Sequence, residues 1–111
     1  MTVGDKDYKL RIGCAEAVDL EEKLGKHPLN IFSKAQEGGI PRMPKISDLV
    51  FCLYYALLHY QPKTELKDVY EIYDKYMDEG HQQSDLILLL MKVFEVSGFV
   101  REDKKDSTEK N

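Results

Sequence analysis

The chain has 111 residues, of which 42% are hydrophobic and 32% are charged, and its formal net charge is −4. This length and this ordinary composition predict one globular domain. The acidic balance argues against nucleic acid and anionic lipid as partners, because both are bound through basic surfaces. No apolar run approaches the roughly 20 residues of a membrane-spanning helix, so we expect a soluble protein.

The N-terminal part of the chain predicts a short strand and two helices. Apolar and polar side chains alternate over Tyr8–Ile12, which is the period of a half-buried strand. Apolar residues at helical spacing predict a helix over Cys14–Leu24. The pair His27-Pro28 predicts the start of a shorter helix that ends at Glu37-Gly38-Gly39. Residues 38–46 hold two glycines and two prolines, so we expect a loop there.

Three more helices are predicted in the second half of the chain. They run from Asp48 to Tyr60 after a Ser47 cap, from a Thr64 cap to Gly80, and from Leu86 to Val96 after Ser84-Asp85. The predicted fold class is mainly α: a compact bundle of about five helices with at most one short N-terminal strand. The helical domain is expected to span residues 1–100. Residues 101–111 carry no large apolar side chain and are predicted to form a disordered charged tail.

The segment LVFCLYYALLHY, from Leu49 to Tyr60, is apolar around almost its whole circumference. It could be a central core helix or a surface made for a partner, and the amphipathic helices predicted around it favour the core. The expected core residues are Leu53, Leu57, Val69, Tyr73, Leu89 and Phe94. The two cysteines, Cys14 and Cys52, have apolar neighbours and no C-x-x-C spacing, which predicts reduced, mostly buried thiols.

No constellation of polar residues predicts catalysis, a cofactor or a metal. The three histidines, His27, His59 and His81, never occur at i, i+4 spacing, so capping or solvation is their expected role. Gly38-Gly39 lacks the spacing and the lysine of a phosphate-binding loop. The tyrosines Tyr70, Tyr73 and Tyr76 follow the apolar stripe of one predicted helix, where a core role is favoured over recognition.

Several segments resemble the tail assembly chaperones of long-tailed, siphovirus-type phages and prophages. The resemblance starts with Tyr8-Lys9-Leu10-Arg11 and LEEKLGKHPLNIF, continues through ISDLVFCLYYALLHY, and is clearest in DVYEIYDKYMDEG and VFEVSGF. It covers roughly residues 8–99. One departure is Gly13-Cys14, where a serine or threonine helix cap is expected. These are patterned segments and not a catalytic signature.

The resemblance implies a role without enzymatic activity. Such chaperones bind the long tape measure protein in the cytoplasm of the bacterial host, keep it soluble, recruit tail tube protein around it, and are absent from the mature virion. We therefore expect apolar contacts rimmed by acidic residues of the span Glu65–Glu79, with Tyr70, Glu71, Asp74 and Asp78 as candidate partner-binding residues. The alternative is a small helical regulatory or adaptor module of a prophage. A DNA-binding module is disfavoured because no predicted helix is basic.

The resemblance also implies a longer form of the chain, made by programmed ribosomal frameshifting near the end of the short form. Glu109-Lys110-Asn111 can be encoded GAA-AAA-AAC, which contains a heptamer on which a ribosome can slip back by one base. The alternative is that these residues are simply a solvated tail.

Overall fold

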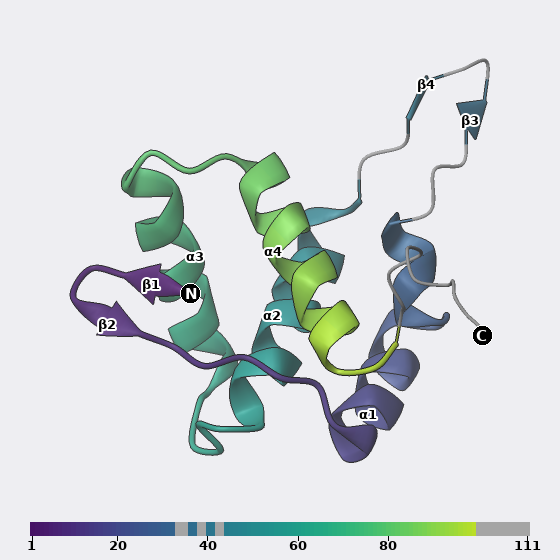
Figure 1. Ribbon diagram of the computed structural model, residues 1–111, viewed down its shortest axis with the longest axis horizontal. Coiled ribbons are helices and arrows are strands. Elements are labelled where there is room, and N and C mark those ends of the chain that lie inside the picture. The colour runs from purple at the N-terminus through teal and green to yellow at the C-terminus, as the bar shows by residue number, and fades with distance from the viewer. Residues whose placement is uncertain (33–35, 38–39, 42–43, 100–111) are drawn as a thin grey trace, which may run out of the picture.

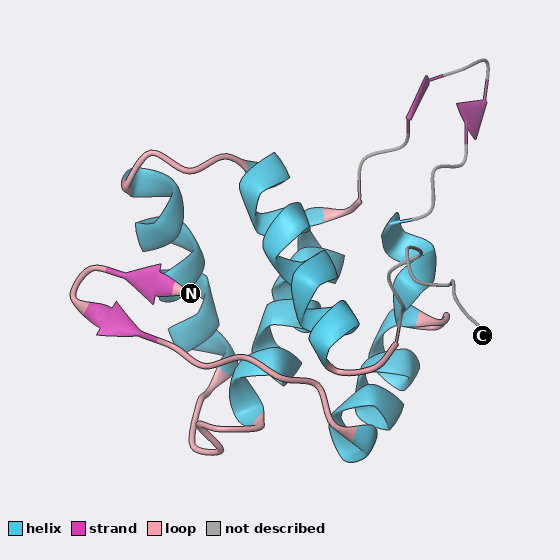
Figure 2. Cartoon of the chain, in the orientation of Figure 1, coloured by secondary structure: helices cyan, strands magenta, loops and turns pink. Residues whose placement is uncertain are grey.

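The computed structural model describes residues 1–32, 36–37, 40–41 and 44–99. The described chain is mainly helical, as predicted (Figures 1 and 2). The elements in the helical part are α1 (Cys14–Leu24), the 3₁₀ helix η1 (Pro28–Phe32), α2 (Ile46–Leu58), α3 (Leu66–Asp78) and α4 (Gln83–Val96). The predicted tail over residues 101–111 lies outside the described residues, and the domain boundary stays a prediction.

Helix α2 is the centre of the fold. It contacts α1, α3 and α4, and Figure 1 shows these helices arranged around it. Because neighbours cover it on several sides, seven of its thirteen residues are buried: Asp48, Leu49, Val50, Cys52, Leu53, Ala56 and Leu57. The one acid in that set, Asp48, forms an ion pair with Lys26 at 3.4 Å. The core assignment of the apolar segment is therefore confirmed.

Most of the predicted core residues are buried, and two are not fully so. Leu53, Leu57, Val69 and Phe94 have no exposed surface. Tyr73 and Leu89 are half-buried, and each packs against the edge of the core. Both side chains therefore lie at the boundary between core and solvent.

The predicted strand at Tyr8–Ile12 is wrong, although its alternation is present. The paired residues come earlier: β1 (Thr2–Val3) and β2 (Lys6–Asp7) form an antiparallel hairpin that turns at Gly4, where φ is +64°. Residues 8–13 belong to no helix or strand. Two of their backbone N–H groups bind the helical part of the chain: the Arg11 N–H donates to the Ala56 carbonyl in α2, and the Ile12 N–H donates to Ser97 Oγ just after α4.

The predicted helix that starts at Pro28 is shorter than expected. It is a five-residue 3₁₀ helix, and its first turn closes when the Asn30 N–H donates to the His27 carbonyl at 2.9 Å. Its predicted end at Glu37 is wrong, because β3 (Gln36–Glu37) pairs antiparallel with β4 (Ile40–Pro41). Part of the predicted loop over residues 38–46 is therefore paired backbone.

The α helices do not begin at the serine and threonine caps that the sequence predicts. Helix α1 has the predicted bounds, and the Gly13 N–H donates to Glu16 Oε1 where a hydroxyl cap was expected. The predicted caps Ser47 and Thr64 are wrong, since Lys45 and Glu65 precede their helices. Helix α4 begins at Gln83, ahead of its predicted start after Ser84-Asp85. In α3 and α4 an aspartate in the first turn accepts the N–H of the capping residue, at 2.9 and 2.7 Å. This hydrogen bond fixes the capping residue at the helix N-terminus, so each helix begins at the next residue.

Candidate functional site

The four candidate partner-binding residues lie on one exposed side of α3. Tyr70 is 52% exposed, and Glu71, Asp74 and Asp78 are exposed as well. Steps of three and four residues along α3 bring these side chains together on the helix surface. The three tyrosines of α3 differ in burial: Tyr76 is buried and Tyr73 is half-buried. Tyr70 is exposed, so the core role favoured for it from the sequence is wrong. We call Tyr70, Glu71, Asp74 and Asp78 the α3 face.

An apolar hollow lies on one side of the α3 face, between α3 and the first turns of α2. Its volume is about 410 Å³. The described residues that line it are Ile46, Ser47, Val50, Phe51, Tyr70, Tyr73 and Asp74. Ile46 starts α2 and is 54% exposed, so a large, half-exposed apolar side chain borders the hollow. Ligand pockets have volumes of roughly 300–1,000 Å³, so this hollow has room for a bulky side chain of a partner.

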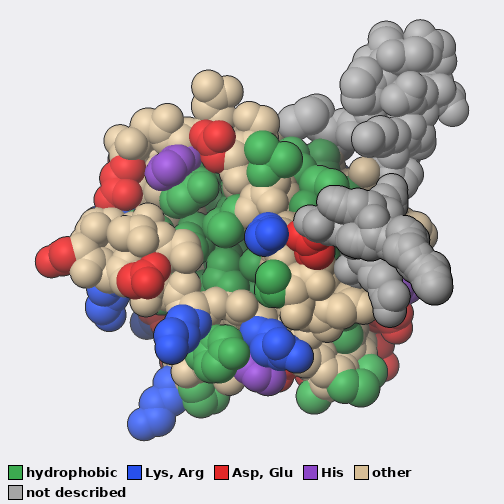
Figure 3. All heavy atoms as spheres, viewed as in Figure 1, with side chains coloured by type: hydrophobic (Ala, Val, Ile, Leu, Met, Phe, Trp, Pro, Cys, Tyr) green, Lys and Arg blue, Asp and Glu red, His purple; other side chains and the backbone are tan. Residues whose placement is uncertain are grey.

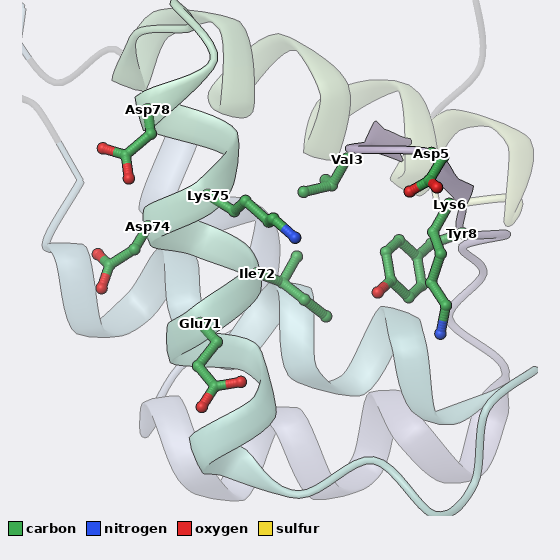
Figure 4. Close-up of a pocket in the computed structure, with 9 residues that line it drawn as sticks. All are labelled: Val3, Asp5, Lys6, Tyr8, Glu71, Ile72, Asp74, Lys75 and Asp78. Atoms are coloured by element: carbon green, nitrogen blue, oxygen red, sulfur yellow. The ribbon is translucent and has the colours of Figure 1, made fainter.

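A second hollow, of about 610 Å³, lies on the other side of α3, between this helix and the N-terminal hairpin. Figure 4 shows Ile72 and Lys75 pointing from α3 toward Val3 and Tyr8, while Asp74 and Asp78 point away. This polar hollow is lined by charges of both signs: Asp5, Lys6, Glu71, Asp74, Lys75 and Asp78. The hairpin is held to α3 by the Gly4 N–H, which donates to Glu79 Oε2 at 2.6 Å.

The carboxylates of the α3 face form no ion pair within the part of the chain that the structure describes. None of the ion pairs among those residues includes Glu71, Asp74 or Asp78. Some acids elsewhere are paired, as Asp48 is with Lys26 and Glu65 with Lys67. The α3 face therefore presents negative charge that a partner cation can meet.

A second group of exposed apolar residues lies on α4. Leu88, Met91 and Val96 are 66%, 44% and 56% exposed. In the view of Figure 3, hydrophobic side chains reach the surface over and beside this helix. Leu88 and Met91 lie on the side of α4 away from its buried residues, whereas Val96 helps to line a hollow of about 410 Å³.

The histidines take structural positions. His59 Nδ1 lies 2.9 Å from Glu16 Oε1 and joins the end of α2 to α1. The His81 ring stacks on Tyr76 with centroids 3.9 Å apart, and His27 Nδ1 accepts the Leu29 N–H. Among the residues that the structure describes, no group of three or more His, Cys, Asp or Glu side chains could hold a metal ion.

Two opposing effects act on the pKa of the Glu16 carboxyl group. Burial by itself raises the pKa of Glu16, but hydrogen bonds from His59 and from the Gly13 N–H outweigh burial and lower the pKa below its ordinary value. The charged form is therefore the stabilised form in the folded chain.

The two thiols have different environments. Cys52 is buried in α2, and burial, together with the nearby Asp48, raises the pKa of its thiol to about 12. Cys14 is exposed at the start of α1, so the prediction that it is buried is wrong. Gly13 turns the chain into α1 there, and Leu20 is the residue of that helix that enters the core. A thiol with a pKa near 12 is no nucleophile at neutral pH.

The whole chain, residues 1–111, matches one protein family. It belongs to DUF6096, a family of unknown function. No curated protein and no solved structure matches the chain. For this member of DUF6096, the described helices include none that is both long and apolar enough to cross a membrane.

The prediction from sequence located the α3 face but missed the residues that make it concave. Ile46, Val50 and Phe51 complete the apolar hollow from α2. Ile46 and Val50 are four residues apart, the spacing of one helix face, and this was the signal that could have revealed them. Because α2 was predicted to start at Asp48, Ile46 fell in the predicted loop and its spacing to Val50 did not count as a helix pattern.

Proposed function

We propose that the protein is a tail assembly chaperone of long-tailed phages or prophages that binds the tape measure protein and keeps it soluble. The observation that carries the proposal is the apolar hollow beside the α3 face, which is lined by the exposed carboxylate of Asp74. The identity of the partner is supported by the resemblance of residues 8–99 to this class of chaperones. The function needs binding and no chemistry.

The physical basis of such a function is the covering of apolar side chains. A long partner exposes apolar surface before assembly, and exposed apolar patches drive aggregation. A segment of the partner that places apolar side chains in the hollow has that surface removed from water. The acidic chaperone then adds net negative charge to the complex, and like charges keep such complexes apart in solution.

In this proposal the chaperone acts in the cytoplasm of the bacterial host and is absent from the mature virion. Tail tube protein is its second partner, because assembly of the tube around the tape measure protein must release the covered segment. A frameshifted longer form of the chain would share the domain described here and add a further segment for tube recruitment.

The test is co-expression of the chain with the tape measure protein encoded beside its gene. We expect the tape measure protein to be soluble with the chain present, to co-purify with it, and to aggregate in its absence. The matched control is the same host with an unrelated acidic helical protein of similar size. A tape measure protein that stays insoluble with the chain, or that is equally soluble with the control, would contradict the proposal.

A further inference from the structure

We infer that the hollow between α2 and α3 takes one bulky apolar side chain of a helical partner segment, and that the α3 face pairs with a lysine or arginine one turn away on that segment. This inference rests on the proposed function and specifies the chemistry of the bound segment. The occupant is a basic amphipathic helix, and the α3 face sets its orientation.

The anchor part of the inference follows from the lining of the hollow. Tyr70 and Ile46 border it from opposite helices, and each exposes about half of its surface: 52% and 54%. Val50 and Phe51 of α2 also line it, the first buried and the second half-buried. A partner side chain placed there contacts apolar groups on both helices at once, which is the setting in which single interface residues contribute most.

The charge part of the inference follows from where the acids lie. Asp74 lines both hollows and is the one charged residue among the described residues that line the apolar one. Glu71 and Asp78 lie three and four residues from it along α3. Lys75 of the same helix points toward the hairpin and away from this side (Figure 4). A cation brought by the partner therefore meets unpaired carboxylates at the α3 edge of the hollow.

The other edge of the hollow has the opposite charge. Lys23 of α1 lies over the Phe51 ring, 5.7 Å from its centroid, and Lys45 immediately precedes Ile46. A basic side chain of the partner is repelled from that edge and attracted to α3. Since one α-helical turn rises about 5.4 Å, residues three or four apart on the partner can reach the hollow and the α3 face together.

The test uses three labelled synthetic peptides of about 18 residues, five helical turns, with the full chain in a fluorescence anisotropy titration. The first has a leucine stripe flanked by lysines, the second has the same stripe flanked by glutamates, and the third keeps the lysines with alanines in place of the leucines. We expect the leucine–lysine peptide to bind at least about ten-fold more tightly than either of the others. Equal binding of the leucine–glutamate peptide, or of the alanine–lysine peptide, would overturn the inference.

Variants of the chain locate the binding to this hollow. Tyr70→Ala should weaken binding of the leucine–lysine peptide by about ten-fold or more, as expected for an aromatic contact at an interface centre. The matched control is Tyr60→Ala, because Tyr60 is 50% exposed and lies outside the hollow. Equal losses from the two substitutions would overturn the inference.

Charge variants test the orientation. Asp74→Asn should weaken binding about three-fold and reduce its dependence on salt, since a rim charge acts mainly through steering. Glu21→Gln removes one exposed charge on α1 and should leave binding unchanged, while Lys23→Gln should not weaken it. Each variant is checked by circular dichroism and thermal melting, and a loss confined to Lys23→Gln would reverse the assigned orientation and overturn the inference.

The two proposals fail separately. If the tape measure protein is kept soluble but the leucine–lysine peptide does not bind, the function stands and the assigned chemistry of the hollow is wrong. If that peptide binds as expected but the tape measure protein is not recognised, the hollow binds basic amphipathic helices and the tail chaperone function is wrong.

Discussion

Replacing Leu53 with alanine measures how much the buried side chains of α2 contribute to the free energy of unfolding. Leu53 has no exposed surface and packs with Val50, Leu57 and Val69 in a cluster that joins α2 to α3. The substitution removes three buried carbon atoms, which at about 0.8 kcal/mol each lowers the free energy of unfolding by about 2.4 kcal/mol. The space left between two helices adds a cavity term, so the expected loss is about 2.4–5 kcal/mol.

The assay is urea unfolding followed by circular dichroism, with thermal melting as a second measure. For a domain of this size the expected loss corresponds to a decrease in Tm of at least about 8 °C. The matched control is Leu88→Ala, which makes the same chemical change at a residue that is 66% exposed. Its effect should stay within about 0.5 kcal/mol. An unchanged unfolding free energy for Leu53→Ala, combined with loss of partner binding, would refute the reasoning and make α2 an interface.

Three other results are expected. Glu16→Gln should destabilise the chain at pH 7, because the lowered pKa of Glu16 contributes stability above the ordinary glutamate pKa that is lost as the pH falls through the folded value. The melting curves of the variant and the native chain should therefore converge in acid, and the exposed control Glu21→Gln should leave the Tm at pH 7 unchanged. A maleimide should label Cys14 in the folded chain and Cys52 only after unfolding, whereas two rapidly labelled thiols would contradict the burial of Cys52. The gene should read GAA-AAA-AAC at Glu109-Lys110-Asn111 with an open −1 frame, and other codons there would exclude slippage at this site.

The mainly helical fold could be predicted because each α helix carries its own periodic apolar pattern. The bounds of α1 were predicted without error, both bounds of α2 differ by two residues, and α4 starts three residues early but ends as predicted. At the start of α3 the Glu65 N–H donates to Asp68 where a threonine cap was expected, and α2 begins after Lys45 without a side-chain cap. Several residues near each start could act as the cap, and the sequence does not say which one the packing selects.

The N-terminal segment shows what alternation can and cannot reveal. Ile12 is buried and Arg11 is exposed, so the period-2 pattern over Tyr8–Ile12 reports correctly which side chains face the core. The pattern does not report the hydrogen-bond partner of the backbone. Here the partners lie on α2 and just after α4, at Ala56 and Ser97, so an extended segment with a strand-like sequence is no strand.

The candidate site was partly predictable for a similar reason. The exposed acids of α3 follow from its own helical period, which the sequence contains. The apolar hollow depends on how α2 and α3 pack, because Ile46 and Tyr70 are 24 positions apart and meet only in the folded chain. The exposure of Tyr70 also depends on that packing, since Tyr73 and Tyr76 on the same stripe are covered.

The central claim is tested most directly by the soluble fraction of the tape measure protein co-expressed with variants of this chain. The native chain and the double variant Tyr60→Ala/Glu21→Gln should keep the tape measure protein soluble. The double variant Tyr70→Ala/Asp74→Asn should fold with an unchanged melting curve and leave the tape measure protein in the pellet. Equal solubility with both double variants would contradict binding through the α3 face, and an insoluble tape measure protein with the native chain would contradict the chaperone function itself.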